Sequence, residues 1–72
     1  MKIIRKTAKR IGDKLGMDWS VDDLGEFTRG MNVELEHRDV TKGNLTLTGM
    51  ITKAHIEEVP DYYAKLKRYV EG

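Results

Sequence analysis

The stretch Met31-Asn32-Val33-Glu34-Leu35-Glu36-His37 decides between two folds for this chain of 72 residues. Its apolar and polar residues alternate, as they do again in 44–49, and such alternation is typical of half-buried strands. One interpretation is therefore a β-hairpin made of 31–37 and 44–49, within an α+β fold. The other is helical, and it places Glu34 and His37 one turn apart on the same face. Periodicity alone slightly favours the hairpin.

Helical patterns lie upstream of this stretch. Apolar residues recur every three or four positions over 2–15 and predict an amphipathic first helix. Gly16 follows it and is expected to end it as a left-handed C′ residue. A second helix is expected over 21–30, with Ser20 as its N-cap, because Asp23 stands three residues later as in a capping box.

A helical pattern also lies downstream. Pro60 is typical of the first turn of a helix, so it predicts a last helix over 60–70. Tyr62 and Tyr63 are adjacent in this helix and should point about 100° apart. We therefore expect one of them in the core and the other partly exposed. Tyrosine is enriched at interaction hot spots, which makes Tyr62 and Tyr63 candidate partner-binding residues.

The composition excludes several classes of protein. The chain has no cysteine, so disulfides and thiolate metal sites are excluded. A net charge of +1 with 39% hydrophobic residues favours a folded domain over a disordered segment. No apolar run approaches the roughly 20 residues of a membrane span, and no apolar segment follows the basic start as it would in a secretory signal. We expect a single domain, 1–72, in the cytoplasm and without membrane contact.

Charge is segregated along the chain. Residues 1–16 carry six basic side chains and one acidic, whereas 17–39 carry seven acidic and two basic. The simplest interpretation is that these two segments lie against each other and so lower their own repulsion. A second hypothesis is that the first helix follows a phosphate backbone and binds nucleic acid without sequence preference. Its candidate nucleic-acid-binding residues are Lys2, Arg5, Lys6, Lys9 and Arg10.

The helical interpretation also predicts a third helix over 46–58. Its apolar face is expected to consist of Leu47, Ile51 and Ala54. Glu58 falls near the centre of that face, and a buried carboxylate is costly unless it is paired, hydrogen-bonded or bound to a metal. His55 can share a surface with Glu58, because the two are spaced i, i+3.

Two motifs thus combine histidine with glutamate at the same spacing. They comprise Glu34, His37, His55 and Glu58. If the motifs face each other on two helices, they match the way helical bundles build carboxylate–histidine sites, which would suit zinc, iron or manganese. The alternative is a structural polar network, in which a glutamate accepts hydrogen bonds from an imidazole and from the hydroxyl of Tyr62 or Tyr63. We expect the network, and no cofactor.

Four short stretches form a specific combination. They are GMNVELEH (30–37), TGMI (48–51), AHIEE (54–58) and PDYY (60–63), with Leu66 after them. Together they resemble a family of small phage and prokaryotic proteins catalogued as a domain of unknown function, with the pattern V-E-x-E-H, I-A-x-x-H-L-x-E and P-x-Y-Y-x-x-L. The chain departs from this family at two positions. Arg38 follows the histidine where the family usually has glycine or threonine, and Thr52 replaces the alanine of I-A-x-x-H-L-x-E. The resemblance implies a helix through His55 and no particular activity.

We therefore predict an all-α fold, a small compact bundle of about four helices. The expected helices are 2–15, 21–30, 46–58 and 60–70, with 31–45 irregular or in a short helix. The α+β fold with a hairpin at 31–37 and 44–49 is the alternative.

The sequence favours a binding protein over an enzyme. Nucleophilic catalysis needs a reactive side chain beside an acid or base, and no cysteine and no marked serine or threonine accompanies the histidines. We predict a small non-enzymatic binding or structural protein of viral or mobile-element type, in the host cytoplasm or virion, that binds a protein partner or forms a homo-oligomer. The alternatives are a His/Glu metal-binding protein and a nucleic-acid-binding protein.

Overall fold

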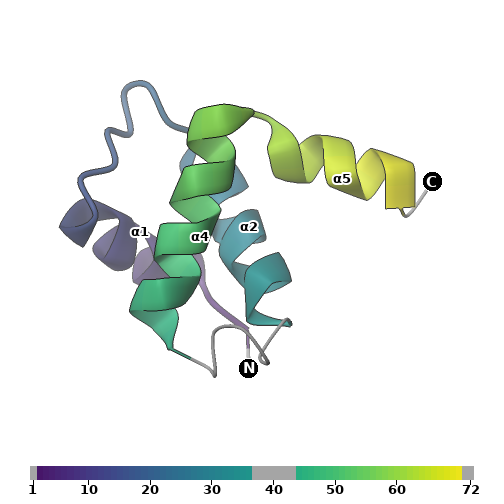
Figure 1. The fold of residues 1–72 in the computed structure, drawn as a ribbon. Helices are drawn as coiled ribbons and strands as arrows, with labels where there is room; N and C mark the ends of the chain where they lie inside the picture. The colour runs from purple at the N-terminus through teal and green to yellow at the C-terminus, as the bar shows by residue number, and fades with distance from the viewer. Residues whose placement is uncertain (1, 37–43, 71–72) are drawn as a thin grey trace.

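The computed structural model describes residues 2–36 and 44–70. In these residues the chain forms four helices and no strand, which confirms the all-α fold. The helices are α1 (Arg5–Lys14), α2 (Leu24–Leu35), α4 (Leu45–Glu58) and α5 (Tyr62–Val70) (Figure 1). The hairpin alternative is wrong, because 31–35 complete α2 and Leu45 already begins α4.

Helix α2 is the central element. It packs against α1, α4 and α5, and α1 and α4 also contact each other. Figure 1 shows α1, α2 and α4 gathered together, with α5 leaving the end of α4 and extending away from α1. Among the described helices, α5 therefore contacts α2 and α4 and not α1.

The core is small and forms one cluster. Its buried apolar residues are Ile3, Ala8, Ile11, Met17, Phe27, Met31, Leu35, Ile56 and Tyr63. Phe27, Met31 and Leu35 follow the i, i+4 spacing of one helix face. That face explains why the alternation over 31–37 misled: Met31 and Leu35 are buried, whereas Val33 lies on another side of α2 and is half-buried.

The end of α1 is as predicted. Gly16 has a φ of +79°, the left-handed conformation that glycine adopts without a steric penalty. The amide of Gly16 donates to the Asp13 carbonyl and the amide of Met17 donates to the Gly12 carbonyl. These two bonds are the Schellman motif, which satisfies the last carbonyls of a helix.

The predicted start of α2 is wrong by three residues. The N-cap is Asp23, whose side chain accepts a hydrogen bond from the Glu26 amide at 3.1 Å. Ser20 lies in the preceding turn, where its amide and its hydroxyl both donate to the Asp18 side chain, at 3.0 and 2.6 Å. These bonds hold the pKa of the Asp18 carboxyl below its usual value. Because Asp18 engages Ser20, the helix starts at the next residue that caps well.

The start of α5 also differs from the prediction. Pro60 lies in a turn, and the helix begins two residues later, at Tyr62. The cap comes from α2: the buried Glu26 carboxylate accepts hydrogen bonds from the amides of Tyr63 at 2.6 Å and Ala64 at 3.3 Å. A carboxylate suits this position, because the free amides and the helix dipole make the N-terminus of a helix positive.

The predicted apolar face of α4 is wrong. The residues that α4 buries are Thr48, Gly49, Thr52 and Ile56. Leu47, Ala54 and Glu58 are exposed, and Ile51 is half-buried.

Two threonines explain this reversal. The Thr48 hydroxyl donates to the Asn44 carbonyl at 2.7 Å, and the Thr52 hydroxyl donates to the Thr48 carbonyl at 2.8 Å. With its hydroxyl bonded inside the helix, threonine behaves in the core like a small branched apolar residue. Small residues on this face also let Ile11 of α1 approach the backbone at Gly49 closely.

Candidate binding surfaces

Three side chains of the predicted polar network meet between α2, α4 and α5. The Tyr63 hydroxyl donates to Glu34 Oε1 at 2.9 Å and lies 3.0 Å from His55 Nδ1. His55 Nδ1 is also 3.2 Å from Glu34 Oε1. The ring of Tyr62 stacks on the His55 imidazole, with ring centroids 4.7 Å apart. One glutamate therefore ties the imidazole of α4 and the phenol of α5 to α2.

The other two members of the predicted cluster lie elsewhere. Glu58 is exposed at the end of α4, so its predicted burial is wrong. His37 lies outside the described residues. Within 2–36 and 44–70, no three His, Asp or Glu side chains are grouped so that they could hold a metal ion. The contacts of Glu34 and His55 are those of a hydrogen-bonded network that joins helices.

The two adjacent tyrosines differ in exposure. Tyr63 is buried, with 1% of its surface exposed, and Tyr62 is half-buried. The edge of one ring faces the other, with ring centroids 4.9 Å apart. Tyr63 is therefore a core residue, and Tyr62 is the one with surface left for contact with another molecule.

The environment of Tyr63 predicts a loss of stability at alkaline pH. Burial is the largest cause that raises the pKa of the Tyr63 phenol well above its usual value. The second cause is the Glu34 carboxylate, which accepts a hydrogen bond from the phenol and stabilises its neutral form. In the unfolded chain the phenol ionises near pH 10. Above that pH the unfolded state has lost a proton that the folded state keeps, so the free energy of unfolding falls as the pH rises.

Ultraviolet absorbance of tyrosinate, followed together with far-ultraviolet circular dichroism, checks this prediction. The Tyr63 signal should rise only as the helical signal is lost. In the Tyr63→Phe variant that late increase should be missing. A phenol signal from Tyr63 that is complete while the chain is still folded would contradict the prediction.

The five predicted nucleic-acid-binding residues are all exposed. Lys9 forms an ion pair with Asp13 at 3.1 Å within α1. The basic and acidic segments do pack together, as α1 on α2, through apolar side chains and a few hydrogen bonds, and none of the ion pairs in the described residues joins the two segments. Every ion pair in the described part of the chain, apart from Glu34–His55, joins residues three or four apart in sequence.

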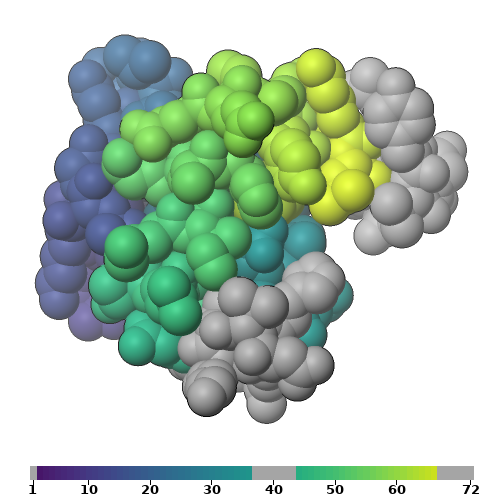
Figure 2. Space-filling view, in the orientation of Figure 1, coloured from purple at the N-terminus to yellow at the C-terminus, as the bar shows by residue number. Residues whose placement is uncertain are grey.

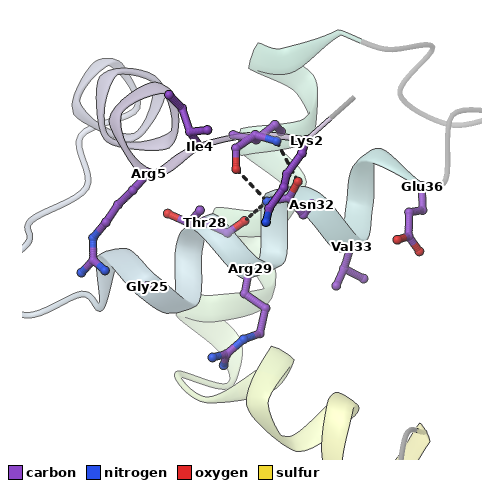
Figure 3. Close-up of a pocket in the computed structure, with 10 residues that line it drawn as sticks. Lys2, Ile4, Arg5, Gly25, Thr28, Arg29, Asn32, Val33 and Glu36 are labelled. Atoms are coloured by element: carbon purple, nitrogen blue, oxygen red, sulfur yellow. Dashed lines mark hydrogen bonds between the residues drawn. The ribbon is translucent and has the colours of Figure 1, made fainter.

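An open groove of about 570 Å³ separates the N-terminal segment from α2. Its lining is formed by Lys2, Ile3, Ile4, Arg5, Gly25, Thr28, Arg29, Asn32, Val33 and Glu36 (Figure 3). Two of the predicted basic residues, Lys2 and Arg5, belong to this lining, and α2 adds Arg29. The groove therefore has three cations and one carboxylate, Glu36, around an apolar centre.

Asn32 holds the two sides of the groove together. Its side-chain oxygen accepts from the Ile3 amide at 2.8 Å, and its side-chain nitrogen donates to the Ile3 carbonyl at 2.9 Å (Figure 3). The same nitrogen donates to the Thr28 carbonyl at 2.9 Å. Since the Ile3 side chain is buried as well, the backbone of the N-terminal segment is fixed where Lys2 and Ile4 enter the groove.

Ile4 is exposed where a polar residue is expected. It is the N-cap of α1, with extended backbone angles, and no side chain caps this end of the helix. Serine, threonine, aspartate and asparagine are strongly preferred at an N-cap. Ile4 nevertheless places an apolar side chain there, and 60% of its surface is exposed in the groove.

Sequence reasoning missed the α2 side of this groove. Arg29 was predicted near the end of a helix, and Asn32 and Val33 in an irregular or short helical segment or, in the alternative fold, in a strand, so no pattern connected them with residues 2–5. One signal was present: asparagine is unfavourable inside a helix unless its side chain has a partner. The partner of Asn32 is Ile3, which lies 29 residues away in sequence.

Comparisons with known proteins establish the family. No helix in the described ranges is both long and apolar enough to cross a membrane. No curated protein and no solved structure matches the chain significantly. A family model described as a protein of unknown function, DUF5661, matches residues 8–71. That match spans α1 to α5 almost completely and agrees with the expectation of an uncharacterised domain. The chain belongs to the DUF5661 family.

Proposed function

We propose that this domain is a non-enzymatic binding module that holds an acidic segment of a protein partner in the groove between residues 2–5 and α2. The observation that carries the proposal is the exposed Ile4 side chain, set among Lys2, Arg5 and Arg29. The groove volume, about 570 Å³, is within the usual range of ligand-binding pockets.

The charges of the groove favour an anionic ligand. Lys2, Arg5 and Arg29 outnumber Glu36, and α1 has no acidic residue in its first turn to neutralise the positive end of its dipole. Arg29 keeps donor groups for a ligand, because its single ion pair uses only Nη1, bonded to Glu26. Glu36 should orient the ligand, since it repels a second carboxylate at that end of the groove.

The apolar part of the groove favours a protein over a nucleic acid. Ile4 and Val33 offer aliphatic surface, which suits a leucine or valine side chain between the carboxylates of a peptide. Recognition of unpaired bases uses aromatic side chains for stacking, and the groove lining includes none. The Thr28 hydroxyl, which also lines the groove, is bonded to the Leu24 carbonyl at 2.7 Å and is not poised as a nucleophile.

Selection from a displayed library of random peptides tests the proposal. We expect enriched peptides to combine Asp or Glu with aliphatic residues. The variant Lys2→Glu/Arg5→Glu should bind them at least about tenfold more weakly, because two attractive charges become repulsive. Both positions are exposed, and a glutamate in the first turn of α1 is favourable for the helix, so this variant should fold.

The matched control is Lys6→Glu/Lys9→Glu. It makes the same change in the net charge of the chain, at exposed positions of α1 that do not line the groove. We expect it to bind the selected peptides as the wild type does. The proposal would be overturned if the enriched peptides lacked acidic residues, or if both double variants lost the same affinity for them. Binding of a random-sequence DNA duplex that both variants weaken would favour the nucleic-acid hypothesis instead, because all four residues belong to its predicted binding set.

Ile4→Ser should change stability and binding in opposite directions. A serine at this N-cap can accept from the free amides of Lys6 or Thr7 and should raise the free energy of unfolding by about 0.5–1 kcal/mol. It also removes the exposed apolar surface, so affinity for the selected peptides should fall severalfold. Urea unfolding and fluorescence anisotropy of a labelled peptide measure the two effects. A more stable variant with unchanged affinity would show that Ile4 has no part in binding.

A further inference from the structure

We propose that two copies of this chain pair through the outer face of α4, with the two helices antiparallel. The outer face consists of Leu47, Met50, Ile51 and Ala54, on the side of α4 opposite to the buried Thr48 and Thr52. Figure 2 shows α4 on the face of the molecule turned toward the viewer, with α1 beside it. This inference rests on a different surface from the groove and does not depend on the proposed function.

The outer face is an apolar stripe that remains exposed. Met50 has 52% of its surface exposed and Leu47 has 36%. The spacing of Leu47, Met50, Ile51 and Ala54 is that of a helix-packing seam, i, i+3, i+4 and i+7. Sequence periodicity marked three of these four residues as a buried face. Within the described residues that face lies in water, and the apolar surface of a second copy would cover it.

Charges at the two ends of α4 select an antiparallel second copy. Glu58 lies exposed at the C-terminal end, beside Glu57, which is paired with Lys53 at 2.9 Å, whereas the first turn has no acidic residue. In an antiparallel pair, Glu58 of each copy approaches the positive N-terminal end of the partner's α4. A parallel pair would instead place the two Glu58 carboxylates together. The charge of Glu58 therefore favours the antiparallel orientation.

The sizes of the side chains also fit that orientation. Leu47 and Ala54 lie near opposite ends of the stripe. When the two-fold axis passes between Met50 and Ile51, Leu47 of each copy lies opposite Ala54 of the other. A large residue then faces a small one at both ends, which lets two helices pack closely along the seam.

The interface should be weak. Four side chains of one helix bury less than the roughly 800 Å² per partner of a standard interface, so we expect a dissociation constant on the order of 10–100 μM. The groove remains open in this dimer, because its α2 residues lie on the opposite side of α2 from Phe27 and Met31, which face the core. Two acidic segments bound at once would then raise the overall avidity.

Sedimentation equilibrium over a range of concentrations is the first test. The wild-type chain should shift from monomer toward dimer at tens of micromolar. Met50→Glu should weaken the dimer by more than about tenfold, because it places two like charges beside the two-fold axis. Val21→Glu is the matched control, because Val21 is apolar and 81% exposed but lies outside α4. The dissociation constant of the Val21→Glu dimer should equal that of the wild type.

Cysteine cross-linking tests the orientation. The chain has no cysteine, so an introduced thiol is its only one. Under oxidation, an equimolar mixture of Leu47→Cys and Ala54→Cys chains should form the mixed disulfide in clearly more than the twofold excess over either symmetric disulfide that random pairing gives. An excess of symmetric Leu47 disulfide would overturn the antiparallel pairing.

The two proposals fail separately. A wild-type chain that is monomeric at hundreds of micromolar, or a dimer that Met50→Glu leaves intact, would overturn the α4 dimer. Neither result affects peptide binding in the groove. Conversely, Lys2→Glu/Arg5→Glu should leave the sedimentation behaviour as it is.

Discussion

Gly30→Ala should destabilise the domain by about 2 kcal/mol, although the same change usually stabilises a helix interior by about 1 kcal/mol. Gly30 is buried in α2 beneath α5. An added Cβ would overlap the ring of Tyr63 and approach Thr52 Cγ2 to 2.6 Å. The ring has no room to move, because the Tyr63 amide is bonded to Glu26 and its hydroxyl to Glu34.

Urea unfolding followed by the fluorescence of the single tryptophan measures this effect. Gly25→Ala in the same helix is the matched control, since an added Cβ there meets only the Asp23 side chain, at 3.1 Å. We expect that control to cost much less than Gly30→Ala, because only the capping oxygen of Asp23 has to shift, by a few tenths of an ångström. A Gly30→Ala variant as stable as Gly25→Ala would contradict the packing of α5 on α2.

Glu26→Ala should destabilise the domain by about 2–4 kcal/mol. The substitution leaves the amides of Tyr63 and Ala64 without an acceptor and removes the anion at the positive end of α5. A domain of this size has a total stability of only about 3–5 kcal/mol, so α5 should detach or the whole chain unfold. Glu26→Gln keeps one acceptor oxygen and should lose less.

Hydrogen exchange resolved by residue distinguishes the two outcomes. If α5 detaches locally, its amides should exchange much faster while those of α1 stay protected. Glu57→Ala is the control: Glu57 is also a helical glutamate in an ion pair, with Lys53, but 58% of its side chain is exposed. Exposed pairs contribute little, so its unfolding midpoint should hardly change. Equal effects of the two substitutions would mean that Glu26 does not cap α5.

The polar network of Glu34, His55 and Tyr63 was largely predictable. The i, i+3 spacing of histidine and glutamate, with a tyrosine hydroxyl from Tyr62 or Tyr63 as a further donor, predicted a network that joins the third helix to the last. Glu58 was assigned to the same group because Leu47, Ile51 and Ala54 were read as the buried face. That assignment failed because Thr48 and Thr52 satisfy their own hydroxyls within α4 and take the buried side.

Interactions between residues close together in the sequence account for the local features that the sequence predicted correctly. The left-handed glycine after α1 and the contrast between Tyr62 and Tyr63 depend on neighbours within a turn or two, whereas the all-α class was predicted from the family resemblance, because periodicity alone slightly favoured the hairpin. Long-range contacts made the remaining choices: Glu26 caps α5 from 37 residues away, and Asn32 binds Ile3 from 29 residues away. A helix surface offers several nearly equivalent faces, and burial against another helix selects one of them. Only the packed structure could therefore place the groove beside α2 and leave the apolar stripe of α4 exposed.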